Sequence, residues 1–259
     1  MMKGIDVSRH QGDINWQKVK DSGIEFAMLR AGYGKIASQE DSRFKANYSG
    51  CTAVGIPCGV YWYSYALTPD DAVKEAEACL AVIKGKKLDF PVYFDIEEMS
   101  QFALGPDKCT AIAEAFCRKI EGAGYWAGIY SYKYFLQSRL ILEIRKRFAV
   151  WVAHTGVHST NYGPQFGIWQ YSHNGSVPGI DGRVDCDYCY IDYPRLIAEK
   201  RLNGSEIMPH TRVYTVKKGD SLWKIAKMYF GTGTRWREIM EFNGLRNETI
   251  FPGQKLRIP

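Results

Sequence analysis

Residues 91–98 read PVYFDIEE, and this stretch decides how the rest of the chain is interpreted. As a strand it places Tyr93, Asp95 and Glu97 on one face and apolar side chains on the other, because strand residues alternate between faces. Two carboxylates at this spacing lie about 6.5–7 Å apart at their Cα atoms, and such crowding raises the pKa of a partly buried carboxyl. We therefore expect Glu97 to stay protonated near neutral pH and to act as a general acid. The alternative is that the chain has left the strand here and both carboxyls are solvated.

Similar short apolar runs recur along the first three quarters of the chain. Eight are rich in Val, Ile and aromatic residues, as strands are: 3–7, 26–31, 58–65, 90–97, 126–131, 148–153, 166–171 and 184–190. Helix-period segments separate the early runs, for example 70–83 after a Thr68-Pro69 start signal, and 107–122. Five strand–helix alternations followed by three strands joined mainly by loops predict an α/β fold. We expect a parallel TIM-like barrel of five β/α units plus three further strands.

Two further acids stand at strand ends of this expected barrel. Asp6 closes the first strand, Asp185 lies in the last, and closure places these two strands side by side. Because barrel sites form at the C-terminal ends of strands, we expect Asp6 and Asp185 to converge with Asp95 and Glu97. Taken singly, each is also typical of a turn or a cap. Four acids without His or Cys partners favour an acidic sugar cleft over a transition-metal site, although oxygen-only Mg²⁺ or Ca²⁺ binding stays open. We expect no metal and no cofactor.

Aromatic and amide side chains occur at the same strand ends. Such side chains suit stacking on sugar rings and binding of polar substituents, although strand alternation sends part of any such set into the core. The candidates for substrate binding are Tyr33, Tyr63, Tyr65, Tyr130, Trp151 and Gln170. The five histidines, at 10, 154, 158, 173 and 210, have no nucleophile or metal-site spacing, so we interpret them as structural, with His10 near the mouth.

The 259 residues suggest one large domain and one small one. We expect the barrel at 1–198, a linker at 199–212 that mixes Gly, Pro and polar residues, and a small strand–helix–helix–strand domain at 213–259. Residues 195–259 carry 13 Lys and Arg against 6 Asp and Glu, so the excess positive charge lies in this last quarter. Such charge favours nucleic acid or any other polyanion, and its sign alone does not choose between them.

The seven cysteines are an odd number scattered through apolar segments, which favours buried, reduced thiols. Cys186 and Cys189 form one C-x-x-C, but a strand would turn them to opposite faces. No apolar run reaches the length of a membrane span, and charge precedes any apolar stretch at the N-terminus. We therefore expect synthesis in the cytoplasm without a signal peptide and no insertion into a membrane.

Six motifs, taken in order, resemble glycoside hydrolase family 25, the N-acetylmuramidases or lysozymes of bacteria and phages. They are GIDVSRHQGDINW (4–16), GVYWYSYAL (59–67), PVYFDIEE (91–98), GIYSY (128–132), WVAH (151–154) and GIWQYSHNGSVPGIDGRVDCD (167–187). The resemblance covers about three quarters of the chain. It implies cleavage of the β-1,4 bond after N-acetylmuramic acid in peptidoglycan, with the family's acids falling on Asp6, Asp95, Glu97 and Asp185 and with Glu97 as proton donor. The extra acid, Glu98, is expected to be turned away from the lumen by strand alternation.

The tail resembles a LysM domain, with YTVKKGDSLWKIA (214–226), NGL (243–245) and IFPGQKLRIP (250–259). The resemblance implies binding to glycan that contains N-acetylglucosamine. The implied contacts fall on two loops, and they are Gly219, Asp220, Ser221 and Leu222 in the first loop and Ile250, Phe251 and Pro252 in the second. The partner would then be a peptidoglycan strand and not nucleic acid.

Together these features predict a two-part endolysin or autolysin that acts at the bacterial cell wall after release, with the barrel cutting the glycan and the tail holding it. A chitinase-like N-acetylhexosaminidase is the enzymatic alternative, since a strand-borne D-x-E also occurs there. An inactive glycan-binding protein is the alternative from another class. Retaining, inverting and acetamide-assisted courses all stay open, because the sequence gives no distance between carboxyls. We favour acetamide assistance, with Asp95 orienting the acetamide.

Overall fold

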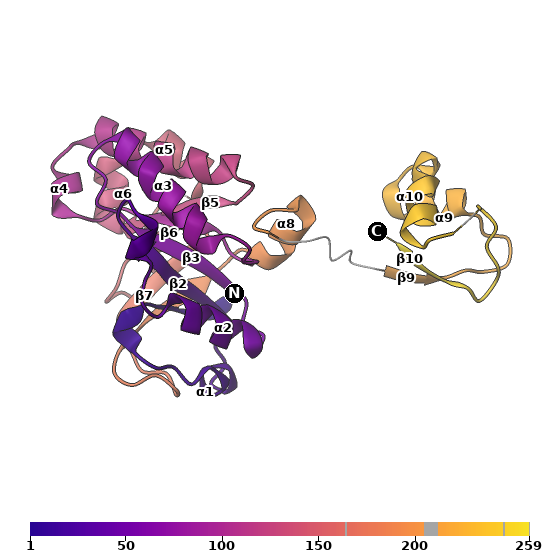
Figure 1. The fold of residues 1–259 in the computed structure, drawn as a ribbon, viewed down its shortest axis with the longest axis horizontal. Coiled ribbons are helices and arrows are strands. Elements are labelled where there is room, and N and C mark those ends of the chain that lie inside the picture. Colours follow the sequence, from indigo (N-terminus) through magenta and orange to yellow (C-terminus); the bar gives the residue numbers. More distant parts are fainter. Residues whose placement is uncertain (164, 205–211, 246, 259) are drawn as a thin grey trace. The chain divides into compact units, whose positions relative to one another are not determined.

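The computed structural model describes residues 1–163, 165–204, 212–245 and 247–258. The chain divides into two compact units, Met1–Ser205 and Glu206–Pro259, each with its own core (Figure 1). Half of the expected linker, residues 205–211 including His210, lies outside the described residues, and the boundaries expected at 198 and 213 stay predictions. Within the described ranges, no helix is both long and apolar enough to cross a bilayer.

The first unit is a closed barrel in which eight strands follow one another in sequence order. The strands are β1 Met2–Val7, β2 Phe26–Tyr33, β3 Cys58–Tyr63, β4 Val92–Asp95, β5 Ala127–Tyr132, β6 Ala149–Ala153, β7 Ile168–Gly175 and β8 Val184–Cys189. The expected barrel is confirmed, but the expectation of an entirely parallel sheet is wrong, because β8 runs antiparallel to both β7 and β1. Only residues 176–183 join β7 to β8, too few for the crossover that a parallel pair needs.

Helices follow most of the strands and pack on the outside of the barrel, but among the described residues none lies between β6 and β7 or between β7 and β8 (Figure 1). They are η1 Arg9–Gln11, α1 Trp16–Asp21, η2 Ala37–Gln39, α2 Phe44–Ala53, α3 Pro69–Ile83, α4 Met99–Phe102, α5 Pro106–Gly122, α6 Lys133–Arg139, α7 Leu142–Arg147 and α8 Tyr193–Lys200. The two helices expected at 70–83 and 107–122 are confirmed as α3 and α5. At the start of α3, Thr68 accepts a hydrogen bond from the Asp71 N–H at 3.1 Å, and Pro69 occupies the first helical position.

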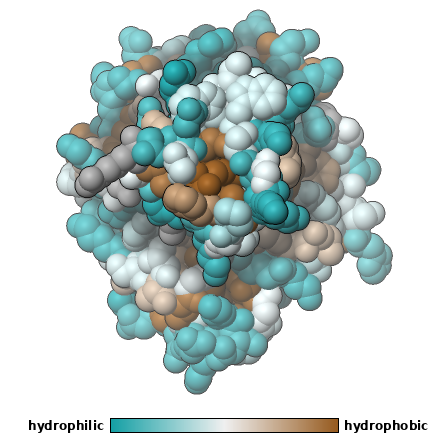
Figure 2. Space-filling view, turned by 90° about the vertical axis from the view of Figure 1, so that its right-hand side faces the viewer, coloured by the Kyte–Doolittle hydropathy of each residue, from teal (hydrophilic) through white to brown (hydrophobic). Residues whose placement is uncertain are grey.

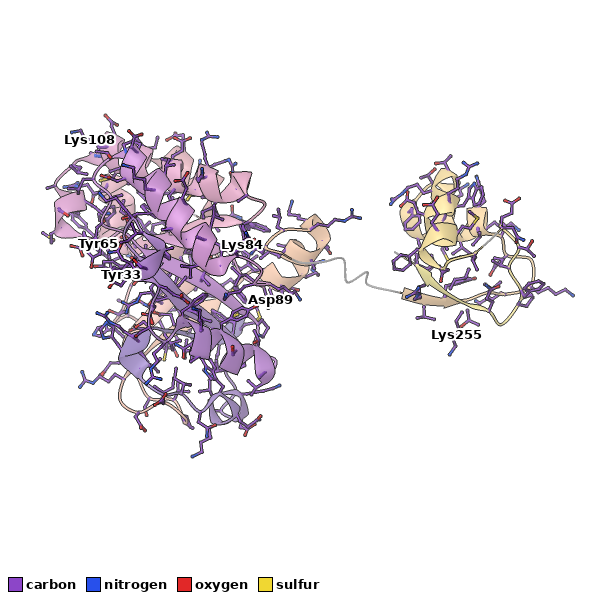
Figure 3. The ribbon with its side chains drawn as sticks, viewed as in Figure 1. Tyr33, Tyr65, Lys84, Asp89, Lys108 and Lys255 are labelled. Carbon is purple, nitrogen blue, oxygen red and sulfur yellow. The ribbon has the colours of Figure 1, made fainter. Side chains whose placement is uncertain are left out.

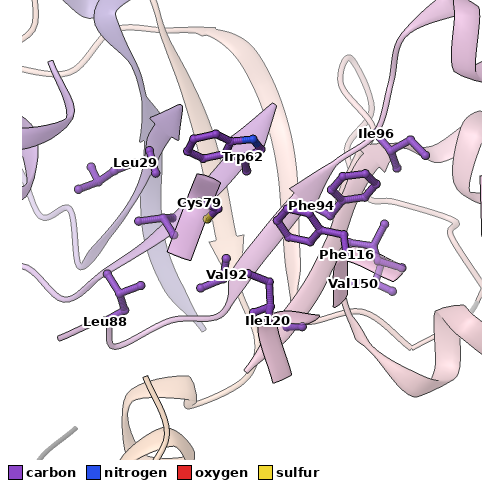
Figure 4. Packing of buried hydrophobic residues seen from close by; sticks show 14 of the residues in the cluster. Leu29, Trp62, Cys79, Leu88, Val92, Phe94, Ile96, Phe116, Ile120 and Val150 are labelled. Atoms are coloured by element: carbon purple, nitrogen blue, oxygen red, sulfur yellow. The ribbon is translucent and has the colours of Figure 1, made fainter. Parts of the chain in front are cut away.

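Alternation along β4 separates two hydrophobic clusters. Val92 and Phe94 face outward, where Phe94 stacks on Phe116 of α5 with ring centroids 4.5 Å apart (Figure 4). Tyr93 faces inward and meets Trp151 of β6 edge-on at 5.5 Å. The seven cysteines are free and buried, and Cys186 and Cys189 belong to opposite clusters, as expected. The same alternation therefore directs Asp95 into the barrel.

The second unit has the expected strand–helix–helix–strand order. Its elements are β9 Arg212–Thr215, α9 Leu222–Phe230, η3 Gly233–Arg235, α10 Trp236–Phe242 and β10 Lys255–Ile258, and β9 pairs antiparallel with β10. Apolar side chains from both helices and both strands form a small core. In Figure 2 most of the visible side chains are hydrophilic, and hydrophobic ones show only in small patches among them.

Candidate active site

The four predicted acids line one pocket of about 310 Å³ at the mouth of the barrel. Asp6 lies near the C-terminal end of β1, and Asp95 ends β4. Asp185 reaches the same mouth because β8 is antiparallel, which brings its beginning, and not its end, beside the end of β1. Asp6 and Asp185 are direct register partners, and directly opposed residues of an antiparallel pair point to the same side of the sheet.

Glu97 lies two residues beyond the end of β4, so strand geometry does not place it. The backbone of Ile96 fixes the segment, since its N–H donates to the Tyr130 carbonyl at 3.1 Å and its carbonyl accepts the Ser131 hydroxyl. The Glu97 side chain is nevertheless half-buried and lines the pocket, which decides against the alternative of two solvated carboxyls. Burial, then the charges of Glu98 and Asp185, raises the pKa of Glu97 to about 7.

Asp95 is more deeply buried, with 3% of its surface exposed. Its Oδ1 atom has no hydrogen-bond partner within the described residues. Burial and the charge of Glu97 raise its pKa well above the usual range, while the Arg30 guanidinium opposes this rise. The pair thus combines a carboxyl that keeps its proton near neutrality with a neighbour whose free oxygen can accept a hydrogen bond.

Asp6 is held by a hydrogen-bond chain across the barrel. Gln170 Nε2 donates to Asp6 Oδ2 at 2.7 Å, and the Tyr130 hydroxyl donates to Gln170 Oε1 at 3.0 Å. Burial, together with the charges of Asp187 and Asp185, raises the pKa of Asp6. The chain fixes one side of the pocket from three different strands.

Asp187 is an acid that the sequence analysis did not single out. It is fully buried beside Asp6; its Oδ1 accepts the Trp151 indole N–H at 2.8 Å, and its Oδ2 has no hydrogen-bond partner within the described residues. Burial is the first cause of its raised pKa. Alternation in VDCD, which turns Asp187 to the same face as Asp185, was the signal that could have revealed it.

The predicted sugar-binding residues divide between two adjoining pockets. Tyr130, Trp151 and Gln170 line the acid pocket, whereas Tyr33 and Tyr65 line a neighbouring pocket of about 460 Å³. Tyr63 lines both pockets. The rings of Tyr33 and Tyr65 meet edge-on at 6.3 Å (Figure 3), and those of Tyr63 and Tyr65 at 5.2 Å. We call the pocket of about 460 Å³ the tyrosine pocket. Its lining also includes Arg9, His10 and Arg30.

Several pocket residues were not predicted, and they are Ser8, Gln11, Arg30 and His173. Arg30 forms an ion pair with the buried Asp41 at 2.7 Å, and a charge within the apolar run 26–31 was a usable signal. His10 lies at the mouth as expected, and His173, which we interpreted as structural, also lines the pocket. Glu98 does not line the acid pocket, and the expectation that it turns away from the lumen stays a prediction. Strand alternation is not what directs it, because β4 ends before it; its carboxylate accepts the Tyr63 hydroxyl at 2.7 Å. Among the described residues, no group of three His, Cys, Asp or Glu side chains has a metal-binding arrangement.

The seven predicted glycan contacts of the second unit fall on two adjacent loops. Val216 joins the loops, since it donates to the Gln254 carbonyl at 2.9 Å and accepts from the Gly253 N–H at 2.8 Å. In the first loop Gly219 has φ +90°, Asp220 accepts from the Tyr214 hydroxyl and the Lys217 N–H, Ser221 caps α9, and the Leu222 side chain is buried in the core. In the second, Ile250 is half-buried, while Pro252 is exposed and Phe251 is 66% exposed. A contact from Leu222 would therefore come from its backbone.

Comparison with known proteins agrees with this geometry. Residues 5–180 match the family Glycosyl hydrolases family 25, and residues 214–259 match the LysM domain. The autolytic lysozyme of Clostridium acetobutylicum is 31% identical over 186 residues, which are 72% of this chain and 55% of that protein. Lysozyme M1 of Streptomyces globisporus is 28% identical over 71% of this chain and 66% of its own length.

This chain therefore spans little more than half the length of the Clostridium acetobutylicum lysozyme. Among solved structures, the lysozyme of Streptomyces coelicolor superposes with a TM-score of 0.65 at 26% identity, covering 79% of this chain and 98% of that one. The chain belongs to glycosyl hydrolases family 25 and carries a LysM domain toward its C-terminus.

Proposed function

We propose that the barrel hydrolyses the β-1,4 bond between N-acetylmuramic acid and N-acetylglucosamine in bacterial peptidoglycan. The observation that carries this proposal is the gathering of Asp6, Asp95, Glu97 and Asp185 around one pocket, with the pKa of Glu97 raised to about 7. A carboxylic acid that retains its proton near neutrality can protonate a departing sugar oxygen.

In the first step, Glu97 donates its proton to the glycosidic oxygen, and the bond from this oxygen to C1 of muramic acid breaks. The carbonyl oxygen of the sugar's own acetamide attacks C1, so no enzyme nucleophile is needed. Asp95 accepts the acetamide N–H through Oδ1, the buried oxygen without a partner. This contact orients the acetamide and stabilises the positive charge that develops on it.

In the second step, the ionised Glu97 takes a proton from water, and the resulting hydroxide opens the cyclic intermediate at C1. The product then carries a reducing muramic acid end, and Glu97 regains its proton. Asp6 and Asp185 contribute negative charge around the developing oxocarbenium centre, and Gln170 fixes the Asp6 carboxylate. The tyrosine pocket provides rings for stacking of neighbouring sugars.

For the second unit, we propose binding to N-acetylglucosamine-containing glycan through the loops around Gly219 and Phe251. Tethering raises the effective concentration of the wall near the barrel without adding a contact at the acids. The chain would act at the bacterial cell wall as an autolysin or endolysin.

Analysis of a peptidoglycan digest by mass spectrometry tests the proposal. After borohydride reduction, the new chain ends should be muramitol, the reduced form of muramic acid. Reduced glucosamine ends would instead identify a different hexosaminidase. Binding of the wall without any new reducing end would identify a glycan-binding protein that has no hydrolytic activity.

A further inference from the structure

The carboxylate of Glu98 accepts a hydrogen bond from Tyr63, a tyrosine that lines both pockets. Its Oε1 accepts the Tyr63 hydroxyl at 2.7 Å, and both side chains are half-buried. Burial, then this hydrogen bond, raises the pKa of Tyr63, so the phenol keeps its proton and remains the donor. Because Tyr63 lines both the acid pocket and the tyrosine pocket, the orientation of its ring affects a sugar chain that crosses from one pocket to the other.

The backbone of Glu98 is held by the fully buried side-chain amide of Gln101. Gln101 Oε1 accepts the Glu98 N–H at 3.0 Å. The Gln101 Nε2 group lies within hydrogen-bond distance of three acceptors in the segment after β3, namely the Ser64 hydroxyl at 3.0 Å and the carbonyls of Ala66 at 3.2 Å and Ser64 at 3.3 Å. One side chain thus joins the segment that follows β4 to the segment that follows β3. Tyr63 ends β3 directly before one of these segments, and Glu98 belongs to the other, so the link through Gln101 holds their backbones near each other.

Glu98 also places a negative charge beside the proposed proton donor. Its charge follows burial as the next cause of the raised pKa of Glu97. The other titratable groups that face Glu97 come from four strands: Asp95 of β4, Asp185 of β8, Tyr63 of β3, and Tyr130 and Tyr132 of β5. Arg30 of β2 acts on Asp95, and His173 of β7 acts on Asp185. Of these carboxylates, Glu98 alone has no part in the proposed reaction steps.

We propose that Glu98 is a positioning residue that holds Tyr63 at the junction of the two pockets and, through its charge, sets the upper pH limit of catalysis by Glu97. The inference rests on the proposed function of the barrel. Two substitutions of Glu98 can remove its charge and its hydrogen bond to Tyr63 separately.

Glu98→Gln keeps an acceptor for Tyr63 but removes the charge. The high-pH limb of kcat/KM should then move to lower pH by about 0.5–1 unit, with KM at pH 5 nearly unchanged, because a nearby like charge disfavours ionisation. Glu98→Asp keeps the charge but withdraws the carboxyl from Tyr63. This variant should leave the high-pH limb of kcat/KM at the same pH and raise KM.

Tyr63→Phe should raise KM to a similar extent, and combining it with Glu98→Asp should add little, because both substitutions break the same hydrogen bond. Glu114→Gln, on the outer surface of α5, is the matched control and should leave the profile unchanged. Circular dichroism and thermal melting establish that each variant is folded.

A Glu98→Gln profile that superimposes on that of the unsubstituted protein would overturn the charge role. Additive effects of Tyr63→Phe and Glu98→Asp on KM would overturn the positioning role. Loss of rate in equal proportion at every pH would identify a merely structural residue. These comparisons use any glycan that the protein cuts, whereas the identity of the new chain ends tests the proposed function, so the two failures are distinguishable.

Discussion

Gln170 and Asp6, 164 residues apart in the chain, are joined by a 2.7 Å hydrogen bond inside the barrel. Gln170 also accepts the Tyr130 hydroxyl at 3.0 Å, so its amide occupies a fixed orientation, with the N–H toward the acid. The proposed charge on Asp6 therefore depends on a neutral neighbour from β7.

Replacing Gln170 by Ala should leave a buried carboxyl without its donor. We expect the free energy of unfolding to fall by about 1–3 kcal/mol, the usual cost of an unsatisfied buried group, and kcat/KM to fall about tenfold or more. Urea unfolding and reducing-end release measure the two effects. Gln17→Ala, which removes an exposed hydrogen bond to Asp21, is the control and should change stability by less than about 0.5 kcal/mol. Stability and activity equal to those of the unsubstituted protein would contradict this role.

Replacing Asp187 by Asn should stabilise the protein at neutral pH. Burial raises the pKa of Asp187 in the folded state above its ordinary value of 3.8, so the unfolded state releases its proton first and stability falls as pH rises from about 4. Asn keeps an acceptor for Trp151 and removes this dependence. The free energy of unfolding of the variant should therefore exceed that of the unsubstituted protein by about 1–2 kcal/mol at pH 7, and the difference should vanish near pH 4. Urea titrations at several pH values measure this, and a difference that grows toward low pH would refute it.

Phe251 is the most exposed aromatic of the proposed glycan loops. Phe251→Ala should weaken binding to purified peptidoglycan about tenfold, because an exposed aromatic at a binding surface contributes on the order of 1.4 kcal/mol or more. Turnover of soluble muropeptide fragments should not change, since the acids lie in a separate compact unit. Val213→Ala, at another exposed apolar side chain of the same unit, is the control. Equal binding by both variants would show that the glycan-binding site lies elsewhere.

The pH dependence of hydrolysis should follow the proton on Glu97. Because the pKa of Glu97 is raised to about 7, kcat/KM should fall as pH rises through about 7 while the fold persists. A rate that stays constant from pH 6 to pH 9 would show that another group supplies the proton.

Strand periodicity accounts for what the sequence could predict about the site. Alternation in 91–98 directed Asp95 inward, and closure of the sheet brought Asp6 beside Asp185. The same reasoning extended β4 two residues too far, so strand alternation is not what brings Glu97 to the pocket or directs Glu98. What places Glu97 is hydrogen bonding of Ile96 to β5, a contact between segments distant in sequence.

Other features depended on interactions that no local pattern encodes. The antiparallel direction of β8 follows from a short connection whose geometry only the closed barrel reveals. A charge within the apolar run 26–31 singles out Arg30, but that run does not encode its ion pair with Asp41. The position of Gln101 under the pocket likewise depends on the packing of α4 against the segment after β3.

Hydrolysis by the Glu97→Gln variant tests the central claim most directly, because Gln has nearly the shape of Glu but cannot supply the proton. Reducing-end release from peptidoglycan should fall by a factor of about 10²–10⁴, the usual contribution of a general acid, while thermal melting remains near that of the unsubstituted protein. The matched control, Glu143→Gln on α7, should retain full activity. A folded Glu97→Gln protein that releases muramic acid ends at close to the unsubstituted rate would contradict the account.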